Sequence, residues 1–169
     1  MEIHSEYNLN HMAHIHEKID FCVEAFVVHQ DKVLLRMHDK LGIWLSVGGH
    51  IELDEDPVQA ILREVKEEVG LDISIIGSEQ GPQSGEASNG GYTYLIPPRY
   101  LGRHPVKEGH EHVVLVYFAT SETDQVNDSV LDHEKGSETK WFTMEELENV
   151  DLIPNIKFYA IEALKELSN

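Results

Sequence analysis

The stretch GGHIELDEDPVQAILREVKEEVGL, residues 48–71, joins a glycine pair, an acidic loop and a segment with helical periodicity. Asp56 is a suitable N-cap, Pro57 fits the first helical position, and Gly70 suits the left-handed residue after a helix. Apolar residues recur at the i, i+3, i+4, i+7 spacing of one helix face, which predicts an amphipathic helix over residues 57–69. The residues of this apolar face are Val58, Ile61, Leu62, Val65 and Val69.

Three glutamates, Glu64, Glu67 and Glu68, lie beside the apolar face of the predicted helix. Carboxylates three or four residues apart on a helix repel one another by roughly 0.2–0.5 kcal/mol per pair. Mg²⁺ prefers oxygen ligands and keeps several waters for substrate phosphates, so a bound cation would turn this repulsion into a binding site. A solvated acidic face is the alternative, and the helix pattern alone does not decide between the two.

The charged residues around this helix are spaced as in the signature of the Nudix hydrolase family. Gly49 is followed after five residues by Glu55, and after seven more by the segment REVKEEVGL at residues 63–71. The chain resembles the family most closely over residues 49–71, and the strands before this stretch and KWFTMEEL after it are arranged similarly. Family members often have proline before the glycine pair, where this chain has Val47, but the turn can still form through the two glycines.

The resemblance implies an α+β fold, an α/β/α sandwich with a mixed β-sheet and the signature helix at residues 57–69. It also implies Mg²⁺-dependent hydrolysis of a phosphoanhydride (diphosphate) bond, either in a nucleoside diphosphate linked to another moiety or in a (d)NTP, with Mn²⁺ as a substitute metal. The implied metal ligands are the Gly48 carbonyl and the carboxylates of Glu64, Glu67 and Glu68. The implied catalytic group is Glu64, Arg63, Glu55 and Glu67, with Glu64 orienting or deprotonating water and Arg63 paired with Glu55.

Arg36 and two loop acids are candidate substrate-site residues outside the signature. Arg36 ends the predicted strand KVLLR, where relatives often place a basic residue that contacts substrate. Glu134 and Glu138 lie before the last predicted strand, in a loop from which many relatives recruit an additional acid. A surface role is the alternative for each of these side chains.

Histidines form a further group of candidates. His110 and His112 alternate in GHEHVVLVY, so both are expected to point to one face of a strand. With His104 nearby they could contact phosphate, base or metal, and His50 follows the glycine pair closely enough to approach the cleft. Ordinary polar residues at the mouth of a strand are the alternative interpretation.

Turn signals and hydrophobic runs predict the remaining elements of a single domain over residues 1–169, with residues 1–19 as a peripheral N-terminal arm. We expect a β-hairpin over residues 21–38 and a third strand in IWLSVGG. Further strands are predicted in LDISIIG, YTYLI, HVVLVYFAT and TKWF, with PPRYLGRHPVKEGHE as a connection and residues 77–91 as a polar loop. Thr143 is a candidate cap of a short helix, and residues 155–168 predict a closing amphipathic helix.

Composition limits the partners of this chain. The formal net charge is −18, from 13 Lys+Arg against 31 Asp+Glu, which argues against a nucleic acid or an anionic membrane as partner. A small phosphorylated ligand remains compatible, because a bound divalent cation reverses the local sign of charge.

Cys22 is the only cysteine and is expected as a buried strand thiol. With neither a secretory signal nor an apolar run of membrane-spanning length, the predicted location is the cytoplasm, and a homodimer is expected from the relatives.

Two other functions are compatible with a Nudix fold. A non-catalytic sensor that binds a nucleotide-like ligand is the main alternative, although such modules usually carry broken signatures and this one is whole. Isopentenyl diphosphate isomerases share the fold but need a cysteine just before a segment like GGHIE, and residues 44–52 contain none. Hydrolysis is therefore the leading hypothesis.

Overall fold

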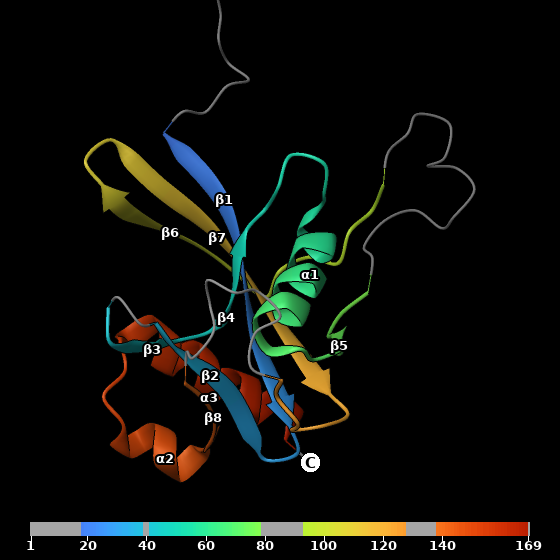
Figure 1. Cartoon of the computed structure of the whole chain (residues 1–169), viewed down its shortest axis with the longest axis vertical. Coiled ribbons are helices and arrows are strands. Elements are labelled where there is room, and N and C mark those ends of the chain that lie inside the picture. Colours follow the sequence, from blue (N-terminus) through green and yellow to red (C-terminus); the bar gives the residue numbers. More distant parts are fainter. Residues whose placement is uncertain (1–17, 39–40, 79–92, 128–137, 169) are drawn as a thin grey trace, which may run out of the picture.

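A mixed β-sheet of eight strands with three helices makes up the described part of the chain in this computed structural model, which covers residues 18–38, 41–78, 93–127 and 138–168 (Figure 1). The strands are β1 Ile19–His29, β2 Lys32–His38, β3 Ile43–Leu45, β4 Val47–His50, β5 Ile73–Ile75, β6 Tyr100–Lys107, β7 His110–Ser121 and β8 Thr139–Thr143. The helices are α1 Pro57–Val69, α2 Met144–Asn149 and α3 Pro154–Leu167.

Strand β1 organises the sheet. It pairs with β7 in parallel along most of its length, with Asp20 opposite His112 and Val28 opposite Thr120. On its other edge, β2 pairs antiparallel near the end of β1, whereas β4 pairs antiparallel with residues 22–25. Strand β6 lies antiparallel on the far side of β7. The strands β4, β1, β7 and β6 are consequently neighbours at one end of the sheet.

The two faces of β1 have different helical covers. Phe26 and Val28 belong to a buried cluster that includes Ile156 and Ala160 of α3. Val23, Ala25 and Val27 belong to a second cluster that includes Ile61 and Val65 of α1. Alternate residues of a strand point to opposite faces, so α1 and α3 cover opposite sides of the sheet. The predicted α/β/α sandwich with a mixed sheet is confirmed.

Helix α1 has the predicted bounds and ends. The Asp56 carboxylate accepts hydrogen bonds from the backbone N–H groups of Val58 and Gln59, and the Gln59 side chain accepts one from the Asp56 N–H, which completes a capping box. Gly70 ends the helix with φ 71°, the left-handed conformation predicted for it. The predicted burial of Leu62 is wrong, because its side chain is 42% exposed.

Other predictions hold in part. The hairpin is confirmed as β1 and β2, Thr143 caps α2, and α3 follows at residues 154–167. The single predicted strand IWLSVGG is divided into β3, which pairs with β2, and β4, which pairs with β1. Strand β1 begins at Ile19, so the predicted arm is too long at its C-terminal end.

The segment between residues 92 and 111 was predicted incorrectly. Residues 93–96 of YTYLI form no strand, and the expected connection contains β6 instead. Gly and Pro within β6 hid it, but the strand is at the edge of its ladder with β7, and the register shifts between Pro105 and Lys107. An edge position with a bulge is where a strand tolerates proline.

Some predictions lie outside the described residues. These are the arm up to residue 17, Tyr92, Glu134 and all but the first two residues of the loop 77–91. Among the helices that the structure describes, none has the length and apolar composition needed to cross a bilayer.

Candidate active site

The two glycines of β4 allow α1 to approach the sheet. A Cβ atom on Gly49 would lie 2.5 Å from Glu64 Oε1, so any other residue there would displace that carboxylate from its present position. Gly48 has φ +151°, and a Cβ there would lie 2.1 Å from the carbonyl oxygen of Val23. The glycine pair of the signature therefore serves close packing: one residue lets β4 lie against β1, and the other receives Glu64.

Arg63 connects the acidic loop to the carboxylates of α1. Its Nε and Nη2 donate to the two oxygens of Glu55 at 3.0 and 2.6 Å, so the predicted Arg63–Glu55 pair is present in a bidentate form. Its Nη1 donates to Glu64 at 2.9 Å and to Glu67 at 3.0 Å, and Nη2 also donates to the His50 carbonyl at 3.1 Å. One guanidinium thus holds three carboxylates and the end of β4 in place.

The charges of this group stabilise one another. Hydrogen bonding to Arg63 lowers the pKa of the Glu55 carboxyl, and the same bonds raise the pKa of the guanidinium further above its ordinary value. Both groups are ionised throughout the physiological range as a result.

Glu68 lies deeper than its neighbours and is 7% exposed. Its Oε1 accepts from Arg36 Nη1 at 2.8 Å, and its Oε2 accepts from the backbone N–H of Gly48 at 2.9 Å. The structure therefore brings Arg36 to the signature helix, beside the glycine whose carbonyl is an expected metal ligand. In this arrangement Arg36 offsets the negative charge of the most buried carboxylate.

Glu138 immediately precedes β8, the strand that pairs with β2 and so with Arg36. It is exposed, its carbonyl oxygen accepts from the Met37 N–H at 2.7 Å, and the following residue, Thr139, pairs with Arg36. The backbone of Glu138 is thus bonded to the residue that follows Arg36. Glu134, the other candidate acid, is outside the described residues.

The candidate histidines gather where β4, β1, β7 and β6 adjoin. We call His50, His104, His110 and His112, together with Asp20 and Cys22, the histidine cluster. The ring centroid of His112 lies 4.9 Å from that of His50, 5.3 Å from His104 and 5.5 Å from His110. Asp20 Oδ2 lies 3.2 Å from His110 Nε2 and 3.6 Å from His50 Nε2. The prediction that His110 and His112 share one face is confirmed by their ring contact.

Two groups of the histidine cluster have shifted proton affinity. Burial lowers the pKa of His112, and the neighbouring His50, His104 and His110 lower it further. Burial, together with the charges of Asp20, Glu24 and Glu64, raises the pKa of Cys22 to about 12, so that without a cation nearby it is a protonated thiol. Cys22 is 7% exposed, as predicted for a buried strand residue.

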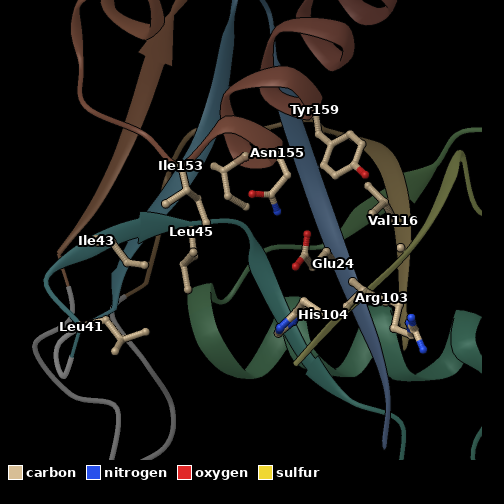
Figure 2. A pocket seen from close by; sticks show the side chains of 13 residues that line it. Glu24, Leu41, Ile43, Leu45, Arg103, His104, Val116, Ile153, Asn155 and Tyr159 are labelled. Atoms are coloured by element: carbon tan, nitrogen blue, oxygen red, sulfur yellow. The ribbon is translucent and has the colours of Figure 1, made fainter. Parts of the chain in front are cut away.

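A pocket of about 470 Å³ lies between α3 and the sheet, where residues of β1, β3, β6 and β7 line it (Figure 2). Its walls are largely apolar, with Ile43 and Leu45 of β3 on one side and Val116 of β7 on the other, and Asn155 and Tyr159 of α3 contribute polar atoms (Figure 2). This is the size of pocket that holds a nucleoside-sized group.

Glu24 lies in this pocket, opposite Gly48 in the β1–β4 pairing. Its Oε2 is buried and has no hydrogen-bond partner among the described residues. Burial raises the pKa of this carboxyl, which a hydrogen bond from Ser46 partly offsets. A buried oxygen without a donor costs free energy, so the pocket contains an acceptor that a ligand N–H could satisfy.

Sequence reasoning missed three of these residues. Glu24 is the one charged residue inside the apolar run FCVEAFVV, a signal that could have identified it. Asp20 carries no local signal, because its partners are set by the register of β1 against β7. Asn155 carries none either, because its place in the pocket depends on how α3 packs on the sheet.

The fold and the site define this chain as an α/β/α protein with a carboxylate-rich site on a helix beside a glycine turn. The family model for the NUDIX domain matches residues 22–164. The chain belongs to the Nudix hydrolase family, and the predicted enzyme class, a hydrolase of acid anhydrides, is confirmed at that level.

Several known proteins are similar to this chain. A CTP pyrophosphohydrolase of Escherichia coli K12 is 30% identical over 110 residues, which are 61% of this chain and 78% of that protein. An RNA pyrophosphohydrolase of Gluconacetobacter diazotrophicus is 37% identical over 62 residues, but the match spans only 32% of that relative. A crystal structure of a NUDIX-family hydrolase from Clostridium perfringens is 34% identical, with a TM-score of 0.79, covering 88% of this chain and 98% of the other.

Proposed function

We propose that the chain hydrolyses a phosphoanhydride bond in a small nucleotide, either a (d)NTP or a nucleoside diphosphate linked to another moiety, with Mg²⁺ as its cofactor. The carrying observation is the clamp in which Arg63 holds Glu55, Glu64 and Glu67 while Gly49 leaves room for the Glu64 carboxylate. Such pre-positioning is what a metal-assisted hydrolase needs.

The donor set suits a hard divalent cation. The proposed ligands are the carboxylates of Glu64, Glu67 and Glu68 and the carbonyl oxygen of Gly48, all of which are oxygen donors. When bound, the cation neutralises phosphate oxygens and lowers the pKa of the attacking water. Arg63 and Arg36 balance the same carboxylates in this structure, so they would keep the ligands in place before and after each turnover.

The chain's own residues account for the proton and the substrate position. Glu64 is the proposed base: it takes the proton from water as the water oxygen forms a bond to phosphorus and the bridging P–O bond breaks. Arg36, whose side chain is 14% exposed beside Glu68, is proposed to stabilise the phosphate groups from the sheet side. His110 and His112 remain candidate substrate contacts.

The pocket that contains Glu24 is the proposed site for the rest of the nucleotide. Its apolar walls would pack against a base, and Glu24 Oε2 would accept a hydrogen bond from an exocyclic or ring N–H group. This chemistry favours a base that presents such a donor toward the sheet, as cytosine does, and one similar protein is a CTP pyrophosphohydrolase.

The test is an activity screen of the purified chain with Mg²⁺ and, separately, Mn²⁺. The substrates are (d)NTPs, nucleotide sugars, ADP-ribose, dinucleoside polyphosphates and coenzyme A. We expect release of a nucleoside monophosphate or phosphate from at least one of them, and loss of that activity by orders of magnitude in Glu67→Gln or Glu68→Gln. Glu145→Gln, which removes the same charge from exposed α2, is the matched control.

Binding without turnover across this screen would favour the sensor function over hydrolysis. Mg²⁺ should also raise the melting temperature of the wild type, because a ligand of the folded state stabilises it. An equal rise in a variant with glutamine at positions 64, 67 and 68 would contradict the proposed metal site.

We also propose a homodimer. Phe21, Leu53 and Leu101 are exposed large apolar side chains, and all three line a single shallow pocket. Exposed apolar patches commonly mark contacts between proteins. Sedimentation velocity would test the proposal, with Leu101→Glu expected to shift a dimer toward the monomer.

A further inference from the structure

The histidine cluster contains two sets of side chains that could bind a metal ion, and none of them belongs to the carboxylate site. The ligand atoms of Asp20, His110 and His112 lie within 4.8 Å of one another, and those of Cys22, His50 and His112 form a second such set. The two sets share His112. Its neighbours come from strands β1, β4 and β7, whose pairing fixes their relative positions.

The side-chain chemistry of this cluster differs from that of α1. Imidazole nitrogens with one carboxylate suit Zn²⁺ and related transition ions, whereas Mg²⁺ prefers a set of oxygens alone. Ligands at about 2.0–2.1 Å from a tetrahedral Zn²⁺ stand roughly 3.3 Å apart. Asp20 Oδ2 and His110 Nε2 are already 3.2 Å apart, so this pair has the separation that a common ion requires.

We propose that Asp20, His110 and His112 form a second metal site, which binds a divalent transition ion of the Zn²⁺ type. All three residues are partly exposed, so an ion can reach them and a fourth coordination position stays open to solvent or to a ligand. Each residue is part of a paired strand, with Asp20 directly opposite His112. Only side-chain rotation is needed to close the three ligand atoms around an ion.

The overlapping set with Cys22 is less suitable. Cys22 binds a metal only as the thiolate, so its proton must leave when the ion arrives. The thiol is buried, with only 7% of the residue exposed, whereas Asp20, His110 and His112 are partly exposed and easier for an ion to reach. Of the two histidines paired with Asp20, His50 is the more exposed, with 59% of its side chain accessible against 18% for His110. We therefore assign His50 and Cys22 to the surroundings of the site.

The proposed site is separate from the carboxylate site. His112, Val114 and Val116 are every second residue of β7 and so share one face of the sheet, the face covered by α3. The carboxylates come from α1, which covers the other face. The two sites share no proposed metal ligand, so Zn²⁺ binding and Mg²⁺-dependent hydrolysis can each fail without the other.

The experiment is a calorimetric titration of the untagged chain with Zn²⁺ in the presence of saturating Mg²⁺, which occupies oxygen-only sites. We expect one tight site in the wild type, weakened more than about 100-fold in Asp20→Asn, His110→Asn and His112→Asn, since loss of even an outer-shell partner commonly costs 10–100-fold. His104→Asn, which removes a neighbouring imidazole outside both ligand sets, is the matched control and should keep the wild-type affinity.

Two outcomes would overturn the proposal. One is wild-type Zn²⁺ affinity in all three ligand variants. The other is loss of the site in Cys22→Ser with retention in His110→Asn, which would assign the ion to the other set. Asp20 is 44% exposed in its side chain, so Asp20→Asn keeps the test valid if His112→Asn fails to fold.

A second measurement identifies the type of site. Co²⁺ in a four-coordinate site absorbs visible light far more strongly than Co²⁺ in an octahedral oxygen site. We expect the strong absorption in the wild type and in the Glu64→Gln/Glu67→Gln/Glu68→Gln triple variant, and its loss in His110→Asn. Absorption that disappears in the triple variant would place the ion at α1 and contradict the proposal.

Discussion

The carboxylates of α1 and the histidine cluster are two groups of potential metal ligands built in opposite ways. Glu64, Glu67 and Glu68 all belong to helix α1, so the geometry of one helix sets their spacing. The members of the histidine cluster come from four different strands, and only the pairing of those strands brings them together. The first group is therefore encoded locally, and the second depends on the whole sheet.

The two groups also differ in how their charges are balanced. Arg63 and Arg36 make ion pairs with all three helix carboxylates. The histidine cluster has one carboxylate, Asp20, shared between two imidazoles. Ion pairs therefore position the carboxylates of α1, and strand pairing positions the histidine cluster.

The largest expected effect is that of Glu64→Gln on catalysis. Loss of a general base commonly reduces rate by about 10²–10⁴-fold, so kcat for the best substrate of the screen should fall by that factor. Zn²⁺ affinity, measured by titration in the same preparation, should stay at the wild-type value if the two groups are independent. A variant that loses both properties would show that the histidine cluster relies on α1.

Gly49→Ala tests the local encoding of the carboxylate site by steric means. The added Cβ would stand 2.5 Å from Glu64 Oε1, so the carboxylate must move away. A displacement of about 1 Å at a catalytic group can cost roughly 10²-fold in rate. Steady-state kinetics together with a melting curve would separate displacement from unfolding. Activity within twofold of the wild type would mean that Glu64 is not the base.

Arg63→Lys is expected to have a smaller effect, and mainly on the metal. Lysine cannot reproduce the fork that holds Glu55, Glu64 and Glu67 together. Apparent Mg²⁺ affinity, from the Mg²⁺ dependence of the rate, should weaken about 10–100-fold. Lys66→Gln, one turn along and bound to Asp72 at the surface, is the control that should leave it unchanged. Arg63 also contacts the His50 carbonyl at the edge of the histidine cluster. If Arg63→Lys weakened Zn²⁺ binding as well, the two metal sites would be coupled through this contact.

The sequence predicts the carboxylate site better than the histidine cluster, because the first depends on one helix and the second on the pairing of several strands. Helix α1, its caps and the Arg63–Glu55 pair follow from spacings within 48–71, because a helix converts sequence separation directly into position. That His110 and His112 share a face follows from strand alternation. Their meeting with Asp20 does not, since it depends on the register of β1 against β7, and β6 was missed because its Gly and Pro resemble a loop.

The smallest effect is expected from a substitution of Glu24, the buried carboxylate of the pocket. Burial raises the pKa of this carboxyl in the folded chain, so the folded state binds its proton more tightly than the unfolded state does. Glu24 therefore costs no stability below the unfolded value near pH 4.3, and an increasing amount as the pH rises through its folded pKa. Unlike the helix carboxylates, its Oε2 has no donor among the described residues.

Glu24→Gln removes the charge and should raise the melting temperature at pH 7.5 by a few °C, since 1 kcal/mol shifts a domain of this size by about 2–4 °C. The difference should shrink toward zero at pH 4, which differential scanning calorimetry at both values would show. Because Gln offers an amide donor as readily as an acceptor, we expect KM for the best nucleotide to rise while kcat changes little. Higher stability with unchanged KM would remove Glu24 from substrate binding and leave it as a buried charge without a function.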